Sequence, residues 1–396
     1  MTRHALISGA SIAGPALAHE LNAQGWRTTV VERAPRLRDE GQNIDVRGAG
    51  REVLRRMDLE DAAREAGTGE RGLRFVDDDG AEVASFPAGE NDTAGGTAEM
   101  EILRGELSRL LYERTRERTD YRFGEQIRAL TDHGDRVTAR LASGEELDAD
   151  VVVVAEGTRS RTRALVMPDV ELTELGLQIA HLTIPRTADD DRWWRWHSAS
   201  GSRSTSLRPD NLGTTRAMLA FLTDVRGLEA LDRDDQVAIL RRTYADVGWQ
   251  APRVLDALDG APLYFDAVAQ VRLPRWSAGR TVLLGDAAWA TGPFGLGTSL
   301  ALVGAYLLAG ELSGGQDTDV ALARYEELMR PFVDKAQDVK PIALRAMNPR
   351  SSAGLSVQRT VLSAAGALSS VFGGLVEKLS GPPAEVIELP DYRSAA

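Results

Sequence analysis

The chain has 396 residues, of which 43% are apolar and 27% charged, and its net charge is −12. This size and composition predict a large core in two domains or one elaborated domain, and the acidic balance without a long basic run disfavours nucleic acid as a partner. The absence of cysteine excludes disulfides, thiolate catalysis and cysteine zinc sites. The N-terminus has no signal-peptide core and no window reaches about 18 uninterrupted apolar residues, so we expect a cytoplasmic protein without a membrane partner.

The N-terminal segment has the pattern of a dinucleotide-binding βαβ unit. Residues 5–8 are predicted to form a short buried strand, and a glycine-containing turn over residues 9–15 follows it. An amphipathic helix to about residue 24 and a second strand over residues 28–31 complete the unit, which ends in Glu32. This is the context that the dinucleotide fingerprint requires.

The spacing within this turn predicts a phosphate cradle. Gly9 allows the tight turn, and Gly14 lets the helix pack closely against the strand. Glu32 follows Gly14 by 18 residues and is placed to accept hydrogen bonds from an adenosine ribose. Ser11 stands where the pattern has its second glycine, so a plain helix–strand turn is the alternative. Arg33 either approaches the adenine or is solvated.

Two segments in the middle of the chain also place candidate ligand contacts at the end of a regular element. Residues 102–111 have helical spacing, with Arg104 near the helix start as either a ligand contact or a surface charge. Residues 150–155 are suited to a central parallel strand, which ends in Glu156 and Gly157. A strand that stops at an acidic residue plus glycine repeats the arrangement of the first cradle.

From about residue 175 to residue 271 the character of the sequence changes. Residues 176–184 and 217–222 look like strands of a separate sheet, with turn signals between them. We interpret this insertion as a substrate-facing β-layer between two parts of a dinucleotide-binding domain. Its tryptophans, Trp194 and Trp196, are either packing residues or an aromatic substrate wall. Its histidines, His181 and His197, are either structural or act as proton shuttles or substrate contacts.

A second cofactor site is predicted near residue 286. A strand-like run over residues 281–284 leads to Gly285 and Asp286, then to a Pro/Gly-rich loop over residues 293–297 and an apolar helix over residues 299–312. The exposed N–H groups and dipole of a helix N-terminus favour negative charge. The alternative for Asp286 is a buried N-cap or turn carboxylate.

The C-terminal tail over residues 355–379 alternates apolar with small residues. An amphipathic membrane helix would carry more Lys and Arg on its polar face. We therefore expect a C-terminal helix that bridges the two domains.

Together these motifs resemble those of the single-component FAD-dependent aromatic hydroxylases, the group with the p-hydroxybenzoate hydroxylase-like fold. We name them in chain order the first motif (residues 9–14 with Glu32), the second motif (residues 156–163) and the third motif (residues 285–297). Glu156 replaces the usual aspartate of the second motif, and Trp289 stands where a histidine is common in the third.

The resemblance covers nearly the whole chain. Residues 41–46 and 101–107 look most like the tetracycline-inactivating monooxygenases and their polyketide-tailoring relatives. The fold implied is α/β, with a Rossmann-type FAD-binding domain, an inserted β-sheet substrate domain and a C-terminal helix. The implied division is residues 1–170 (first FAD part, with substrate-site segments near 70–100), 171–272 (substrate β-layer), 273–345 (second FAD part) and 346–396 (bridging helix and tail).

The resemblance also implies roles for individual residues. Asp45, Arg104 and Asp286 would contact the flavin, with Asp286 on the ribityl chain, and Arg38 would contact NADPH or NADH. The implied FAD-binding set is Gly9, Ser11, Ile12, Ala13, Gly14, Glu32, Arg33, Asp45, Arg104, Gly285, Asp286, Pro293, Gly295, Leu296, Gly297 and Thr298. The expected substrate contacts are Trp194, Trp196, Phe221, Trp289 and Phe294, among which Trp289 is the first candidate for tuning the reaction.

The implied activity is that of a monooxygenase. NAD(P)H reduces FAD, O2 adds at flavin C4a, and the hydroperoxide delivers one oxygen to an electron-rich polycyclic aromatic or polyketide-like substrate. The flavin carries the chemistry, so we expect no catalytic protein nucleophile and no metal, and the chain acts as a monomer or homodimer. Helix N–H groups near residues 295–298 would stabilise negative charge on the reduced flavin, by ~3 kcal/mol each.

Two alternatives stay open from sequence. The same flavin cradle serves other FAD oxidations, namely Baeyer–Villiger insertion, epoxidation or dehydrogenation. A flavoprotein that binds or sequesters a small molecule without turnover is the alternative from a different class. A plain Rossmann dehydrogenase would not explain the third motif.

Overall fold

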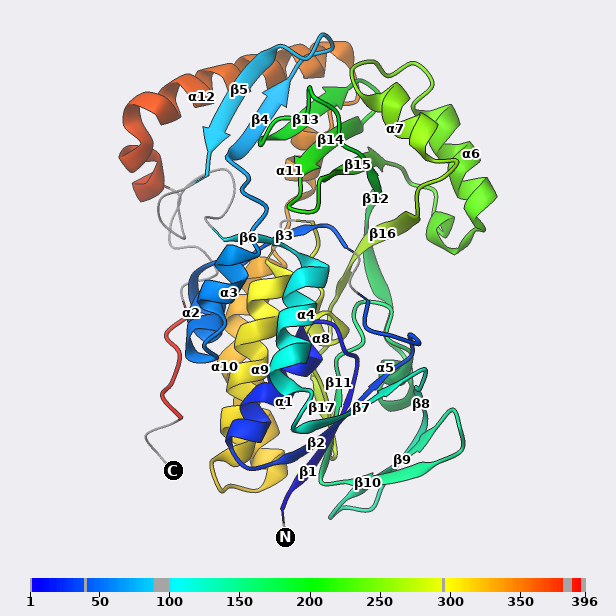
Figure 1. Cartoon of the computed structure of the whole chain (residues 1–396), viewed down its shortest axis with the longest axis vertical. Helices are drawn as coiled ribbons and strands as arrows, with labels where there is room; N and C mark the ends of the chain where they lie inside the picture. The colour runs from blue at the N-terminus through cyan, green and yellow to red at the C-terminus, as the bar shows by residue number, and fades with distance from the viewer. Residues whose placement is uncertain (1, 39–40, 89–99, 294–295, 380–386, 393–396) are drawn as a thin grey trace.

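The computed structural model describes residues 2–38, 41–88, 100–293, 296–379 and 387–392. Two sheets organise the chain, one above the other in the view of Figure 1. The lower sheet belongs to the part that carries both the N-terminal strand and the third motif. The upper sheet is built from the middle of the chain and an earlier hairpin.

The lower sheet is parallel except at one edge. Ile7 pairs with Val153 on one side and with Val30 on the other. The apolar runs of these strands are buried, as expected for a parallel sheet that is covered on both faces. This arrangement confirms the predicted α/β class with a Rossmann-type unit. The strand order is β17 (Ser277–Ala278), β18 (Thr281–Leu283), β11 (Val151–Val154), β1 (His4–Ser8), β2 (Arg27–Glu32) and β7 (Thr119–Phe123).

Helices and a small sheet cover the two faces of this lower sheet. Ile7 points into a core that includes α1 (Ala13–Ala23) and α9 (Gly297–Ser313), which pack on each other. Leu6 points the other way, into a cluster with the small sheet. Helix α9 is apolar on every side because it is enclosed. The other elements of these layers are α10 (Thr318–Ala336), α4 (Arg104–Thr115), β8 (Ile127–Asp132), β9 (Val137–Leu141) and β10 (Glu146–Ala149).

The upper sheet is antiparallel apart from one strand pair. Leu182 and Leu219 face a core with two helices that cover one side of it, α6 (Arg233–Thr243) and α7 (Ala251–Ala257). Alternate residues such as His181 therefore point to the opposite face. The strand order is β16 (Leu263–Val271), β12 (Leu172–Pro185), β15 (Thr214–Leu222), β14 (Arg203–Pro209), β13 (Trp194–Ala199), β4 (Gly72–Val76) and β5 (Glu82–Pro87).

A short ladder of β3 (Asn43–Asp45) and β6 (Glu101–Leu103) lies between the two sheets (Figure 1). Here one prediction was wrong, because the helix expected over residues 102–111 begins only at Arg104. Ile102 pairs with Ile44, and Leu103 is extended (φ −68°, ψ 136°). The leucine spacing could not reveal that a distant strand pairs with the first two residues of the segment.

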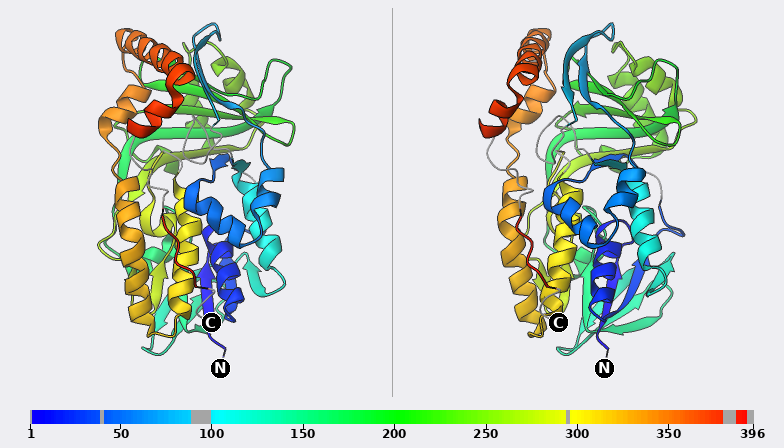
Figure 2. Two further views of the ribbon diagram at one scale, coloured as in Figure 1. Left: turned by 90° about the vertical axis from the view of Figure 1, so that its left-hand side faces the viewer. Right: turned by 60° about the vertical axis from the view of Figure 1, so that its left-hand side comes forward.

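The C-terminal region confirms the predicted helix, whereas its expected role as a bridge between the two domains stays a prediction. Helix α12 (Ser352–Leu379) lies against β5 and β13 of the upper sheet. The tail that follows it returns to the lower part (Figure 2), where the Tyr392 hydroxyl donates to Glu311 Oε1 (2.6 Å). Within the described residues no helix is long and apolar enough to cross a membrane. The remaining helices are α2 (Gly48–Arg56), α3 (Glu60–Glu65), α5 (Arg161–Val166), η1 (Leu228–Ala230), α8 (Asp286–Trp289) and α11 (Pro341–Met347).

Candidate functional site

The three motifs meet at one edge of the lower sheet. The first motif follows β1 and ends at Glu32 of β2, the second follows β11, and the third follows β18. These four strands are parallel neighbours, so their carboxyl ends lie together, where open α/β sheets bind ligands. A Cβ added at Gly285 would lie 3.2 Å from Ala13 Cβ, which shows that the first and third motifs are in contact.

The glycine turn of the first motif is as tight as its sequence predicts. Gly9 has φ +115°, and a Cβ there would lie 2.4 Å from the carbonyl oxygen of Ala155. A Cβ at Gly14 would lie 2.0 Å from the carbonyl oxygen of Gly9. Only glycine fits at both positions, because no movement of a flexible side chain could relieve a clash with backbone. Ile12 and Ala13 begin helix α1 beside this turn and are buried.

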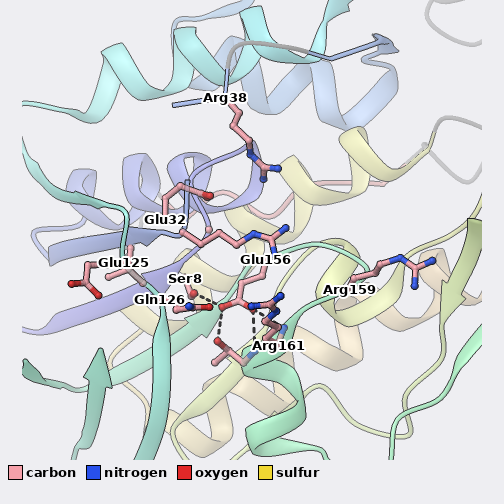
Figure 3. Close-up of a pocket in the computed structure, with 12 residues that line it drawn as sticks. Ser8, Glu32, Arg38, Glu125, Gln126, Glu156, Arg159 and Arg161 are labelled. Atoms are coloured by element: carbon pink, nitrogen blue, oxygen red, sulfur yellow. Dashed lines mark hydrogen bonds between the residues drawn. The ribbon is translucent and has the colours of Figure 1, made fainter. Parts of the chain in front are cut away.

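Glu32 lies at the wall of a cleft. Its Oε2 accepts from the Ala10 N–H (3.0 Å) and its Oε1 from the Ala34 N–H (2.9 Å), and each carboxylate oxygen keeps a lone pair for a further donor. The cleft has a volume of about 430 Å³, and Figure 3 shows Glu32, Glu156 and Arg38 around it. It is lined by Ser8, Gly9, Val31, Glu32, Arg33, Arg38, Glu125, Gln126, Glu156, Arg159, Arg161 and Thr162.

Ser11, the departure from the fingerprint, is joined to Arg104. The Arg104 Nη1 donates to Ser11 Oγ (3.1 Å), and Ser108 Oγ donates to the Ser11 carbonyl (3.0 Å). The serine hydroxyl therefore connects the phosphate turn to a cation at the start of α4. Sequence reasoning placed both residues at the cofactor but did not predict this contact.

The second motif holds the edge together through its acidic residue. Glu156 accepts from the hydroxyls of Ser8, Ser160 and Thr162 and from the N–H of Thr162 (3.0 Å). Burial raises the pKa of Glu156, but these hydrogen bonds outweigh it and the net pKa lies below its ordinary value. Glutamate thus satisfies the donors at the start of α5, although aspartate is usual here.

Arg163 ties the second motif to the third. It is buried, and its Nη1 donates to the Ala287 carbonyl (3.0 Å), at the helix that carries Asp286. Its Nη2 donates to the Thr158 carbonyl (2.8 Å). The position of Asp286 therefore depends on a residue 123 positions earlier in the chain.

Asp286 lies beside the start of α9. Its side chain is exposed, yet the protein around it raises the pKa of its carboxyl, against the opposing charge of Arg104. A Cβ added at Gly297 would lie 3.2 Å from Asp286 Oδ1, so the carboxylate and the α9 N-terminus form one site. Pro293, Leu296 and Thr298 flank this loop, whereas Phe294 and Gly295 lie outside the described residues.

Asp45 reaches this region from the β3–β6 ladder. Arg47 Nη2 donates to Asp45 Oδ2 (3.1 Å), and the Arg47 N–H donates to Ser299 Oγ (3.0 Å) in the first turn of α9. A Cβ at Gly50 would lie 2.7 Å from Ser299 Cα. The segment after Asp45 thus packs on the helix that begins the flavin side of the site.

Two expected substrate contacts are wrong. Trp289 has no exposed surface, and its ring lies 4.6 Å from that of Trp276 and against Gly304, inside the lower core. Phe221 points to the face of the upper sheet that α6 and α7 cover, where it is buried with Tyr244 and Phe265. Both side chains stabilise cores, and neither faces the space beside Asp286.

Trp194 and Trp196 lie on the opposite face of the upper sheet, with their rings 5.5 Å apart. Trp196 lines a cavity of about 190 Å³ beneath α12 and so packs on the C-terminal helix. The Arg208 guanidinium lies 4.1 Å from the centroid of the Trp194 ring. His197 is fully buried on the face of the upper sheet that α6 and α7 cover. Its Nε2 lies 2.9 Å from Asp78 Oδ1, and this contact gives His197 a structural role.

Sequence reasoning missed Tyr264 and left His181 open. These two residues pair across β12 and β16 with stacked rings 6.3 Å apart. Burial, Arg208 and Arg104 lower the pKa of His181 to about 4, and burial raises the pKa of Tyr264 to about 12 although Tyr264 is 57% exposed. The charge of Arg104 contributes to the pKa shifts of both groups and of Asp286, so all three lie within electrostatic reach of Arg104. Only the alternation of β12 could have indicated this face of the sheet.

A buried charge cluster joins the upper sheet to the β3–β6 ladder. Arg208 of β14 contacts Glu70 through two hydrogen bonds (2.8 and 3.0 Å), Glu101 at 2.9 Å and Asp45 at 3.6 Å. Burial raises the pKa of both Glu70 and Glu101, and Arg208 opposes that effect. One arginine between three carboxylates favours a proton on the cluster. We call these four residues the Arg208 cluster.

The Arg208 cluster makes stability depend on pH. The pKa of Glu70 rises from its ordinary value of 4.5 to about 8 in the folded protein. Between these values the folded state binds more protons than the unfolded state, so stability is lost as the pH rises. We expect the free energy of unfolding to fall between pH 5 and pH 8, by up to about 1.4 kcal/mol per pH unit, and this decline to be smaller in Glu70→Gln. Urea unfolding at each pH measures it, and equal slopes in both proteins would contradict the assignment.

The geometry fits FAD along the whole edge. The cleft at Glu32 suits the adenosine end, the Ser11–Arg104 pair lies at the phosphate turn, and Asp286 with the α9 N-terminus forms a polar end. The fold and the site define an FAD-binding protein of the Rossmann type.

Comparison with known proteins gives the family. A family described as FAD binding domain matches residues 2–340. The chain is 35% identical to the flavin-dependent monooxygenase eupH of Phoma sp, covering 98% of this chain and 97% of that protein. The crystal structure of tetracycline destructase Tet(55) is similar with a TM-score of 0.80 and 30% identity, covering 99% of both chains. The chain belongs to the FAD-dependent monooxygenases.

A more distant structure shares the fold alone. Klebsiella pneumoniae HpxO complexed with FAD and uric acid has a TM-score of 0.77 at 20% identity, covering 96% of this chain and 97% of that chain. That structure holds FAD on the same architecture.

Proposed function

We propose that the chain uses NAD(P)H and O2 to oxygenate a polycyclic aromatic or polyketide-like small molecule. The observation that carries this proposal is that the three motifs meet at one edge of the lower sheet. The stacked pair of His181 and Tyr264 lies on the upper sheet, within reach of the charge of Arg104. The relative Tet(55) is a tetracycline destructase, which supports a polycyclic substrate.

The protein's part in this reaction is binding, orientation and exclusion of water. Glu32 would accept the ribose hydroxyls of FAD, Arg104 would neutralise the phosphates, and Asp286 would hold the ribityl chain. The N–H groups at the start of α9 would stabilise negative charge on the flavin ring. When bound, FAD supplies the redox and oxygen-activating chemistry.

His181 and Tyr264 would contact the substrate from the upper sheet. The lowered pKa of His181 keeps its imidazole neutral, so it offers one donor and one acceptor without attracting bulk water as a cation would. The Tyr264 hydroxyl donates to Asp266 Oδ2 (3.1 Å), and Asp266 pairs with Arg159 (3.0 Å). Trp194 remains a proposed aromatic contact on the same face.

The reductant would contact Arg38. Arg38 lines the cleft together with Arg33, and a guanidinium suits a phosphate or carboxamide of NADPH or NADH. The division into FAD and substrate parts at residues 170/171 and 272/273, a cytoplasmic location and a monomeric or homodimeric state belong to the same proposal.

The test is a sequence of three measurements on the purified protein. We expect a bound yellow flavin, NADPH or NADH consumption that an aromatic polyketide accelerates by about tenfold or more, and a product heavier by one oxygen atom. A product of unchanged oxygen content would favour dehydrogenation. Substrate binding without any acceleration of NAD(P)H oxidation would identify a binding flavoprotein and reject the proposal.

A further inference from the structure

Two buried glutamines enclose the loop that joins α8 to the flavin side of the third motif. Gln270, near the end of β16, and Gln337, at the C-terminal end of α10, are 2% and 3% exposed. The loop between them runs from Ala290 to Pro293. These glutamines come from segments that neither carry a cofactor motif nor adjoin one in sequence.

The two amide groups hold consecutive carbonyls of this loop. Gln337 Nε2 donates to the Ala290 carbonyl (3.1 Å) and to the Val271 carbonyl (2.7 Å). Gln270 Nε2 donates to the Thr291 carbonyl (2.8 Å) and to the Gln337 carbonyl (3.0 Å). Both N–H groups of each amide are therefore used, and the two glutamines are bonded to each other as well as to the loop.

The loop needs these donors because it is irregular and buried. Ala290 and Thr291 are 3% and 5% exposed, and buried carbonyls without partners are costly. Gly292 has φ +103°, a backbone conformation that residues with side chains rarely adopt, and a Cβ there would lie 3.0 Å from Leu175 Cδ1. An apolar side chain at Gln270 would fill the space but remove the donor to the Thr291 carbonyl. One at Gln337 would remove the donors to the Val271 and Ala290 carbonyls, of which the Ala290 carbonyl would keep the Val271 N–H (3.2 Å).

We call the side-chain amides of Gln270 and Gln337 the clamp, and the position of the loop indicates what the clamp does. The loop connects the helix that begins with Asp286 to the helix that begins with Gly297, and a Cβ at Gly297 would lie 3.2 Å from Asp286 Oδ1. A shift of the loop would move the α9 N-terminus relative to the carboxylate. Gln270 also belongs to the upper sheet, and Gln337 begins the connection to α11, so the clamp joins the flavin loop to the substrate sheet and to the C-terminal region.

We infer that Gln270 and Gln337 are positioning residues that fix the flavin loop to the substrate sheet. They act through the backbone of Ala290 and Thr291 and do not themselves touch cofactor or substrate. The inference rests on the proposed function, since it assumes that flavin binds at Asp286 and the α9 N-terminus. It assigns a role in the reaction to two side chains outside the three motifs.

The test compares Gln337→Met and Gln270→Met with a matched control. Both variants keep side-chain volume and remove the donors. Gln236→Met in α6 is the control, because Gln236 is also buried and its Nε2 donates to three backbone carbonyls (3.1 to 3.3 Å) of residues 228–231, which belong to none of the three motifs. Four quantities are measured on each protein. They are the midpoint of urea unfolding, the Kd for FAD, the visible circular dichroism of bound FAD, and the hydrogen exchange of residues 290–292 in the apoprotein.

We expect the control to lose stability with the FAD Kd unchanged. Each clamp variant should raise the FAD Kd by about tenfold, the loss that corresponds to about one amide hydrogen bond, and change the visible dichroism. It should also accelerate exchange in the loop and increase the share of NAD(P)H electrons released as hydrogen peroxide, because a displaced flavin is less well shielded from water.

Unchanged FAD Kd, dichroism and peroxide share in both clamp variants, with stability lost as in the control, would overturn the inference. If Gln337→Met does not fold, Gln270→Met decides alone, since it leaves the two bonds of the Gln337 amide in place. A wild-type protein that binds no FAD would instead reject the proposed function. A wild-type protein that binds FAD and oxygenates, together with unaltered clamp variants, would reject only the role of the two glutamines.

Discussion

Replacing Asp286 with alanine is expected to give a folded but colourless protein. The carboxylate would accept hydroxyl hydrogen bonds of the ribityl chain, and a charge-assisted hydrogen bond contributes about 1.5–3 kcal/mol. The Kd for FAD should therefore rise by roughly 10- to 150-fold. Titration of the apoprotein with FAD, followed by the quenching of flavin fluorescence, measures it.

The same substitution should leave the apoprotein as stable or more stable. The surrounding protein raises the pKa of Asp286 above its ordinary value of 3.8, so the ionised carboxylate opposes folding at neutral pH. Removing the group removes that penalty. Loss of cofactor affinity together with a gain in apoprotein stability would mark a side chain placed for a ligand rather than for the fold.

Asp246→Ala is the matched control for Asp286→Ala. Asp246 is 73% exposed and pairs with Arg203, remote from the three motifs. The Asp246→Ala variant should bind FAD as the wild type does. Retention of yellow FAD at unchanged affinity in Asp286→Ala would remove Asp286 from the cofactor site. A large loss of stability in the apoprotein would return it to the alternative of a structural turn carboxylate.

The largest effect on stability is expected for Arg208→Met. The variant keeps most of the side-chain volume but leaves Glu70, Glu101 and Asp45 without their shared cation. Glu70 and Glu101 are only 1% and 4% exposed, so their charges cannot be solvated. Removing one partner of a buried charge cluster costs about 3–5 kcal/mol, and we expect the free energy of unfolding to fall by that amount at pH 8.

Two further variants show whether the cluster is the cause. Arg241→Met removes an arginine whose partner Asp259 is 80% exposed, and it should cost at most about 1 kcal/mol. Glu70→Gln combined with Arg208→Met should recover part of the stability, because it removes one of the uncompensated carboxylates. A loss in Arg208→Met no greater than in Arg241→Met, or a double variant no more stable than the single one, would show that the carboxylates do not depend on Arg208.

The cofactor edge could be predicted from sequence because its signals are local. A strand, a glycine turn and a helix within residues 4–23 follow from apolar runs and from backbone positions that only glycine can occupy. The same holds for strand β11 before Glu156 and strand β18 before Asp286. Once the strands are parallel neighbours, their carboxyl ends must lie together.

The substrate side could not be predicted in the same way. Trp289 and Phe221 were expected at the substrate because they are aromatic and lie near a motif or in the β-layer, yet both point into cores. The side of a strand or helix that faces the ligand depends on the layer that covers the other side. His181 and Tyr264 share a face only because β12 pairs with β16 in one register.

The sequence by itself therefore determined the fold class, the three motifs and the family resemblance, since each rests on chemistry within a few residues. The tertiary structure alone decided that Ser11 pairs with Arg104 and that Arg208 shares three carboxylates. It also decided that Gln270 and Gln337 hold the flavin loop. In each case the partners are tens to hundreds of residues apart, and their meeting depends on strand order, register and the packing of two sheets. Those are properties of the whole chain that no local pattern contains.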